Sequence, residues 1–141
     1  MDWNDFLSDF PDPKPPVVDV KAENRWDAID ELLDQLVAHK RIRLEDREAI
    51  AASVKKRESS MTTGIGFGIA IPHASTDLVS QFVGIIGRST RGIQFDALDL
   101  KPVRLAMLFL VPKGKFQEHV QVLANIAKLL HKMGPGGQGT K

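Results

Sequence analysis

Residues 62–73 of the 141-residue chain carry the stretch TTGIGFGIAIPH. Glycines stand at three alternate positions, Gly64, Gly66 and Gly68, and no side chain of the stretch is acidic or a lysine or arginine. Because glycine has no Cβ, this spacing lets the backbone approach another group closely. The Ile-Ala-Ile that follows predicts a short strand. Pro72 lacks an N–H group, so we expect it to end the strand's hydrogen-bond ladder and to set the direction of His73.

A histidine held at the end of a strand, beside exposed backbone N–H groups, suits nucleophilic catalysis. Near pH 7 imidazole is neutral enough to attack an electrophile, and its phosphorylated form is labile enough to pass the group on. The spacing alone leaves two other interpretations open. In one, the glycines serve only packing and His73 caps a turn. In the other, the segment is a phosphate-binding loop, although it lacks the lysine and the following helix of such loops.

The pattern on both sides of this stretch predicts a mixed α/β domain built in layers. Apolar residues recur at helical spacing over residues 25–39, with Asn24 as the cap, and a weaker stripe of Ala49, Ile50 and Val54 predicts a helix over 45–57. Strands are predicted at 17–20, 81–87, 93–95 and 103–111, with a turn at 96–99 and a final helix at 117–132. The apolar run 103–111 has the composition of a central strand covered on both faces.

Composition limits the classes of function. Apolar residues make up 43% of the chain, charged residues 26%, and the net charge is +1, so charge alone predicts neither nucleic-acid nor membrane binding. The chain has no cysteine, which excludes disulfides and thiolate chemistry, and its four histidines lack the clustered spacing of a metal site. We find neither a signal peptide nor an apolar run long enough to span a bilayer, and therefore expect a cytoplasmic protein without membrane insertion.

Residues 64–73 resemble the active-site segment of enzyme IIA domains of the bacterial phosphotransferase system, in the fructose, mannitol and nitrogen-regulatory class. The resemblance extends over about residues 17–132. Three further motifs match in order: Arg57-Glu58, the FDALD segment at 95–99 with Pro102-Val103 behind it, and Glu118-His119. The resemblance implies a three-layer α/β/α sandwich with a mixed sheet, of the phosphotransferase/anion-transport-protein-like type, with His73 at the sheet edge.

The resemblance also implies a role for each matched residue. His73 would be the phosphoryl acceptor, and Arg57 would hold phosphate oxygens with its planar fork of donors. His119, at a predicted helix N-terminus that favours an anion, would donate a hydrogen bond to the phosphoryl group or orient His73. The positions expected to support phosphate binding are Thr62, Thr63, Gly64 and Gly66. No metal or cofactor is required.

The implied partners are a histidine-phosphorylated carrier protein as donor and a IIB domain or a regulatory protein as target. No IIB or membrane segment is attached to this chain, which favours the nitrogen-regulatory type over transport. The alternative is an unphosphorylated regulatory or binding module with the same fold. The presence of both His73 and His119 argues against that alternative.

The chain departs from the family pattern in two places. Phe67 stands where the family often has a small or polar residue. Family members usually continue beyond the last matched helix, whereas residues 133–141 form a glycine-rich tail here. Residues 1–16 form a proline-rich arm that carries Trp3 and Phe6. We expect this arm to cover apolar surface in place of the final segment, either on its own domain or in a homodimer.

Overall fold

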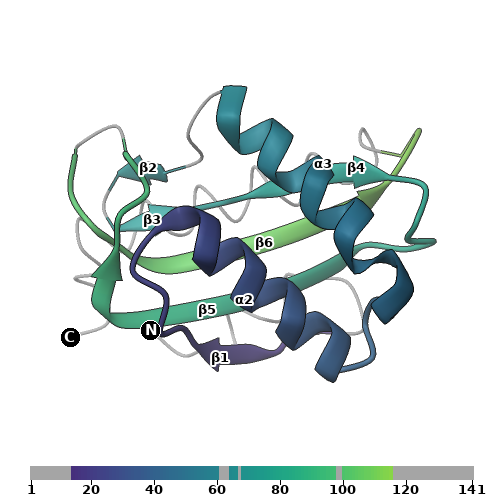
Figure 1. Cartoon of the computed structure of the whole chain (residues 1–141), viewed down its shortest axis with the longest axis horizontal. Coiled ribbons are helices and arrows are strands. Elements are labelled where there is room, and N and C mark those ends of the chain that lie inside the picture. Colours follow the sequence, from purple (N-terminus) through teal and green to yellow (C-terminus); the bar gives the residue numbers. More distant parts are fainter. Residues whose placement is uncertain (1–13, 61–63, 67, 98–99, 116–141) are drawn as a thin grey trace.

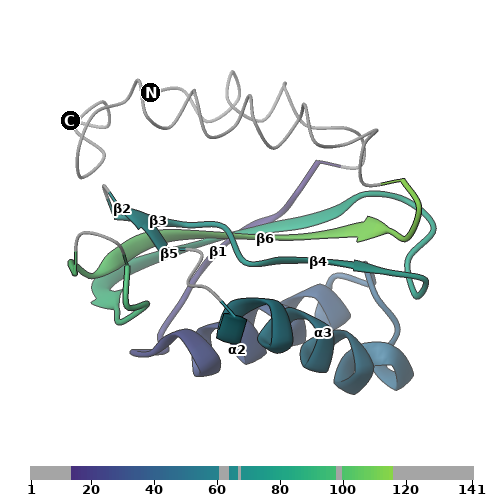
Figure 2. The ribbon, with the colours of Figure 1, turned by 90° about the horizontal axis from the view of Figure 1, so that it is seen from above.

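A computed structural model of the chain describes residues 14–60, 64–66, 68–97 and 100–115. In this part of the chain, six strands form one mixed sheet, and both α-helices pack on the same face of it (Figure 1, Figure 2). The predicted α/β class with a mixed sheet is confirmed. The predicted final helix at 117–132 lies outside the described residues, so the second helical layer of the predicted sandwich stays a prediction.

The sheet is built around one long antiparallel pair. Its strands are β1 (Val17–Asp19), β2 (Gly64–Gly66), β3 (Ile69–Ala70), β4 (His73–Thr76), β5 (Val83–Ile93) and β6 (Val103–Pro112). Their order is β1-β5-β6-β3-β2, and β4 also pairs with β6. β5 and β6 are antiparallel, β1 is parallel to β5, and both β3 and β4 are parallel to β6. As predicted for a central strand, β6 is buried without interruption from Ala106 to Val111.

β3 and β4 lie end to end along the same side of β6. Ile69 pairs with Leu105 and His73 pairs with Phe109, so the register is the same on both sides of Pro72. The prediction that the ladder ends at Pro72 is therefore wrong. Proline removes one donor, but the carbonyl of Pro72 still accepts a hydrogen bond from the Phe109 N–H at 3.0 Å. His73 consequently begins a second short strand.

The helices begin and end close to their predicted positions. α2 spans Arg25–Ala38, and the Asn24 side chain caps it by accepting from the Asp27 N–H at 2.9 Å. The predicted helix 45–57 begins as a 3-10 turn, η1 (Leu44–Asp46), and continues as α3 (Arg47–Ser60). The buried face of α3 consists of Ile50, Ala51, Val54 and Glu58, whereas Ala49 is exposed. The apolar stripe of this helix thus ends in a carboxylate.

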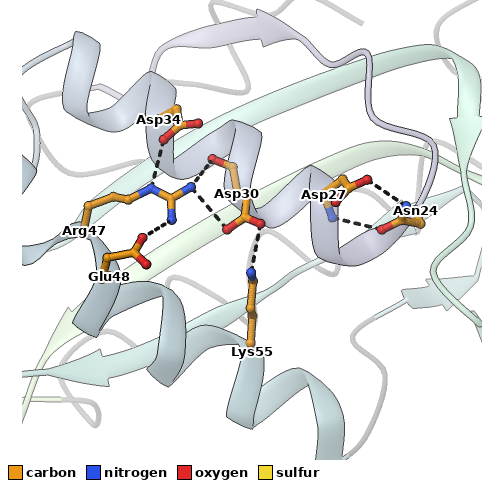
Figure 3. Close-up of polar contacts among 7 residues, drawn as sticks. All are labelled: Asn24, Asp27, Asp30, Asp34, Arg47, Glu48 and Lys55. Atoms are coloured by element: carbon orange, nitrogen blue, oxygen red, sulfur yellow. Dashed lines mark hydrogen bonds and ion pairs between the residues drawn. The ribbon is translucent and has the colours of Figure 1, made fainter.

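Polar contacts fix α3 against α2 (Figure 3). The Arg47 guanidinium donates from Nε to Asp34 at 2.9 Å and from Nη2 to Asp30 at 3.2 Å. Lys55 Nζ donates to the second carboxylate oxygen of Asp30 at 2.9 Å. Because both cations come from α3 and both carboxylates from α2, these contacts hold α3 at a fixed position along α2.

The sequence pattern divided β5 incorrectly. Strands were predicted at 81–87 and 93–95, but one strand runs from Val83 to Ile93, with a shift of register between Arg88 and Ile93. Gly92, at φ 92°, and a hydrogen bond from its N–H to the Ser89 hydroxyl at 2.9 Å accommodate this irregularity. Phe95 lies outside the strand and is fully buried, so its apolar character reflects core packing.

Candidate functional site

An open pocket lies between the C-terminal half of α3 and the first residues of β4. Its volume is 590 Å³. Its lining residues are Ser53, Lys56, Arg57, Ser60, His73, Ala74 and Ser75. On β4, Ala74 joins the hydrophobic core, while its neighbours His73 and Ser75 are half-buried and exposed. The alternation along the strand therefore anchors the backbone in the core and leaves the two polar side chains at the pocket.

The ring of His73 is held by its own chain. Nδ1 lies 2.8 Å from the carbonyl oxygen of Ile71. A carbonyl only accepts, so this contact is a hydrogen bond when Nδ1 carries the proton. In the neutral ring Nε2 then has a free lone pair. This carbonyl belongs to Ile71, which lies between β3 and β4 in the same motif. The motif therefore also determines which nitrogen of His73 carries the proton.

The surroundings of His73 favour the neutral ring. Burial lowers the pKa of His73 below its ordinary value of 6.5, and the positive charge of Arg57 lowers it further. The hydrogen bond to Ile71 and the negative charge of Glu58 act in the opposite direction without reversing the shift. At pH 7 the imidazole is therefore predominantly neutral and able to act as a nucleophile.

Arg57 and Glu58 are consecutive on α3 but lie in different surroundings. Arg57 lines the same pocket as His73. The side chain of Glu58 is fully buried and forms an ion pair with Nη1 of Arg25 at 3.1 Å. No sequence motif pointed to Arg25. The available signal was Glu58 itself, since it continues the buried face of Ile50 and Val54 in steps of four residues.

Gly64 serves close packing. A Cβ at this position would lie 2.8 Å from Cβ and 2.9 Å from Cα of Ala97, so the segment at Phe95 and Ala97 leaves no room for a side chain. Gly68 adopts a left-handed conformation at φ 78°. Part of the glycine pattern is thus explained by packing and turn geometry. The roles predicted for Gly64 and Gly66 in phosphate binding stay predictions.

The structure brings together only some of the predicted site residues. His73 and Arg57 share one pocket, whereas Thr62, Thr63, Phe67 and His119 lie outside the described residues. Within the described ranges, no three His, Asp or Glu side chains are grouped as metal ligands would be. None of the helices in this part of the chain is long and apolar enough to cross a membrane.

The family model of the phosphoenolpyruvate-dependent sugar phosphotransferase system, EIIA 2, matches residues 16–133. The chain belongs to this family. It is 43% identical over 106 residues to the fructose-specific EIIA component of Haloferax volcanii, covering 74% of this chain and 68% of that protein. It is also 36% identical over 86 residues to a nitrogen regulatory protein of Bradyrhizobium diazoefficiens, covering 61% of this chain and 56% of that protein.

Solved structures show the same fold for this EIIA chain. The nitrogen regulatory protein IIA-Ntr of Neisseria meningitidis superposes with a TM-score of 0.69 at 30% identity, covering 78% of this chain and 73% of that one. The complex of mannitol enzyme IIA with phosphorylated enzyme IIB from Escherichia coli gives a TM-score of 0.66 at 22% identity, covering 82% of this chain and 78% of that one. These comparisons confirm the resemblance to EIIA domains and the α/β fold.

Proposed function

We propose that this EIIA chain is a phosphoryl carrier, in which Nε2 of His73 accepts a phosphoryl group from one protein and passes it to another. The observation that carries the proposal is the 2.8 Å contact between His73 Nδ1 and the Ile71 carbonyl, which leaves Nε2 as the nucleophilic atom. The lowered pKa of His73 keeps that atom unprotonated near pH 7. Arg57 in the same pocket supports the proposal because a guanidinium suits phosphoryl oxygens.

The transfer step exchanges one nitrogen–phosphorus bond for another. The Nε2 lone pair of His73 forms a bond to phosphorus while the bond to the donor's imidazole breaks, and the donor nitrogen keeps that electron pair. The proton on Nδ1 of His73 stays in place, where the Ile71 carbonyl offsets the positive charge of the phosphorylated ring. Arg57 balances the charge on the phosphoryl oxygens, and His119 would add a hydrogen bond. Positioning and charge stabilisation supply most of the catalysis in such steps.

The proposal includes the partners and the place of action. A histidine-phosphorylated carrier protein is the donor, in the cytoplasm, and a IIB domain is a recipient. The Escherichia coli complex of mannitol enzyme IIA with phosphorylated enzyme IIB supports the second partner by analogy of fold.

Two destinations of the phosphoryl group compete. The 43% identity to a fructose-specific component favours sugar transport, in contrast to the nitrogen-regulatory type that the sequence analysis favoured. The nitrogen-regulatory role is the second candidate, and it is supported by the 36% identity to a nitrogen regulatory protein and by the structural likeness to IIA-Ntr. Onward transfer to a fructose-type IIB domain separates the two.

The experiment uses a phosphorylated carrier and intact-mass measurement. The wild-type chain should gain one acid-labile phosphoryl group and lose it when a fructose-type IIB domain is added. His73→Ala should gain none, while His39→Ala, which removes an exposed histidine at the end of α2, should behave like the wild type. Phosphorylation of His73→Ala at the normal rate would refute the assignment. Phosphorylation of the wild type without onward transfer would leave the nitrogen-regulatory role.

A further inference from the structure

Arg25, the first residue of α2, connects its own helix to α3 and to the segment at residues 94–96. Its Nη1 contacts Glu58 at 3.1 Å and its Nη2 contacts Asp96 at 3.5 Å. Its guanidinium lies 4.5 Å from the centre of the Trp26 ring. The Arg25 backbone N–H donates to the Gln94 carbonyl at 3.0 Å. Only 18% of the Arg25 side chain is exposed, so this cation has a defined position.

We propose that Arg25 is a positioning residue for phosphoryl transfer at His73, acting through Glu58 on one side and through Asp96 on the other. The inference rests on the proposed function, because the transfer at His73 is what Arg25 would assist. Arg25 is not among the residues that line the pocket, so it acts through its neighbours and is not itself a catalytic residue.

The first path runs through the last turns of α3. A buried carboxylate is tolerated only when it is paired, and the ion pair with Arg25 helps to hold Glu58 in its inward position. Glu58 directly follows Arg57 on the helix. Holding Glu58 inward therefore holds the Arg57 backbone in the orientation that places its side chain in the pocket of His73.

The second path runs through the segment that supports the glycines. Asp96, which adopts φ 51°, precedes Ala97, and Ala97 packs directly on Gly64 at the start of β2. Arg25 thus contacts the helix that ends at Ser60 and also the segment that packs on Gly64. These two positions flank the predicted phosphate-binding residues Thr62 and Thr63. The Arg25 guanidinium therefore links the two elements between which Thr62 and Thr63 lie in the sequence.

The charges near His73 explain why its titration reports on Glu58. From α3, the charged residues at or beside the pocket are Lys56, Arg57 and Glu58. From β6, the residues alongside β4, 109–112, are uncharged. The negative charge of Glu58 raises the pKa of His73, and the positive charge of Arg57 lowers it. Removing Arg25 would change the charge or the position of Glu58, and the pKa of His73 should therefore change.

The experiment compares Arg25→Gln with Arg88→Gln in the full chain. Arg88 lies on β5, which β6 separates from β4, and it pairs with the exposed Asp19, so this control removes the same charge. The first readout is the titration of His73 followed by NMR on unphosphorylated protein. The second is the rate of phosphoryl acceptance. Arg25→Gln should shift the pKa of His73 away from its wild-type value and lower kcat by about ten-fold, with KM for the donor unchanged.

Two further variants keep the inference testable if Arg25→Gln folds poorly. Arg25→Lys keeps the charge beside Glu58 but lacks the fork that reaches Asp96 as well, so its kcat should be intermediate. In the background of Glu58→Gln, adding Arg25→Gln should leave the titration of His73 unchanged. An Arg25→Gln or Arg25→Lys protein that titrates and reacts like Arg88→Gln would overturn the inference. If even the wild type accepts no phosphoryl group, the proposed function fails, while the titration still tests the link from Arg25 to His73.

Discussion

At the scale of single residues, the decisive feature is the environment of one imidazole. Residues 71–72 join β3 to β4, and the carbonyl of Ile71 is the partner of His73 Nδ1. The motif predicted a histidine with a fixed direction, and the structure gives the physical reason. In the proposed transfer, the same contact leaves Nε2 as the reacting nitrogen.

The lowered pKa of His73 predicts a pH dependence. Phosphoryl acceptance should fall as the pH falls through the pKa of His73, which lies below 6.5, because the protonated ring has no lone pair on Nε2. Protonation of His73 should also destabilise the fold. The unfolded chain binds the proton first, so this loss begins as the pH falls through 6.5 and is complete below the folded-state pKa. An NMR titration of His73 with its midpoint above 6.5 would contradict both expectations.

His119 carries the second prediction at this scale. His119→Ala should fold and should accept or pass the phosphoryl group about ten- to a hundred-fold more slowly. This range corresponds to the loss of one charge-assisted hydrogen bond of about 1.5–3 kcal/mol in the transition state. Single-turnover rates in both directions measure the effect. Rates equal to those of the wild type would remove His119 from the site.

The proposed acceptor His73 could be predicted from the sequence, whereas Arg25 could not. The neighbourhood of His73 and Arg57 followed from motif order, because the family pattern already contains both residues. Arg25 was missed because its contact with Glu58 joins positions 33 residues apart, and no local pattern records such a pair. A buried glutamate on a helix face was the only local indication.

At the scale of elements, the glycine segment and the ladder beside β6 shape the site. Local pattern predicted the helices well, since their apolar spacing and the Asn24 cap are local features. Local pattern failed where the pairing of strands decides how far a strand extends. β5 continues through the irregularity at Gly92, and the ladder continues beyond Pro72, because in both cases β6 provides the partner strand.

Gly64→Ala tests the packing of that segment. The added methyl would lie 2.8 Å from Cβ of Ala97, a contact that requires backbone movement, so we expect a loss of about 1–3 kcal/mol in the free energy of unfolding. Urea denaturation measures it. Gly114→Ala serves as the control, because its methyl meets nothing within 4 Å and only the cost of φ 82° remains. A Gly64→Ala protein as stable as the wild type would show that the contact is not rigid.

At the scale of the whole molecule, the two faces of the sheet differ. α2 and α3 cover one face (Figure 2), and the described residues place no helix on the other. Phe109 of β6 lies outside the core cluster that packs on the helices, its ring centre is 5.2 Å from that of Phe82, and both rings are buried. A layered domain needs cover on both faces. The sequence predicts two sources of cover, the helix at 117–132 and the aromatic arm at 1–16.

Deleting residues 1–12 tests the arm. If Trp3, Phe6 and Phe10 contribute cover, their removal should lower the melting temperature by more than about 5 °C or convert a homodimer to monomers. Circular dichroism and light scattering report the two outcomes. Unchanged stability together with an unchanged molar mass would show that the arm plays no such part.

The central claim is that His73 accepts the phosphoryl group through Nε2, and NMR of the phosphorylated protein with nitrogen-15 histidine tests it most directly. After incubation with a phosphorylated carrier, we expect phosphorus coupling to a single nitrogen, Nε2 of His73, with Nδ1 still protonated beside Ile71. Phosphorus on Nδ1, on another histidine, or on no histidine at all would contradict the account.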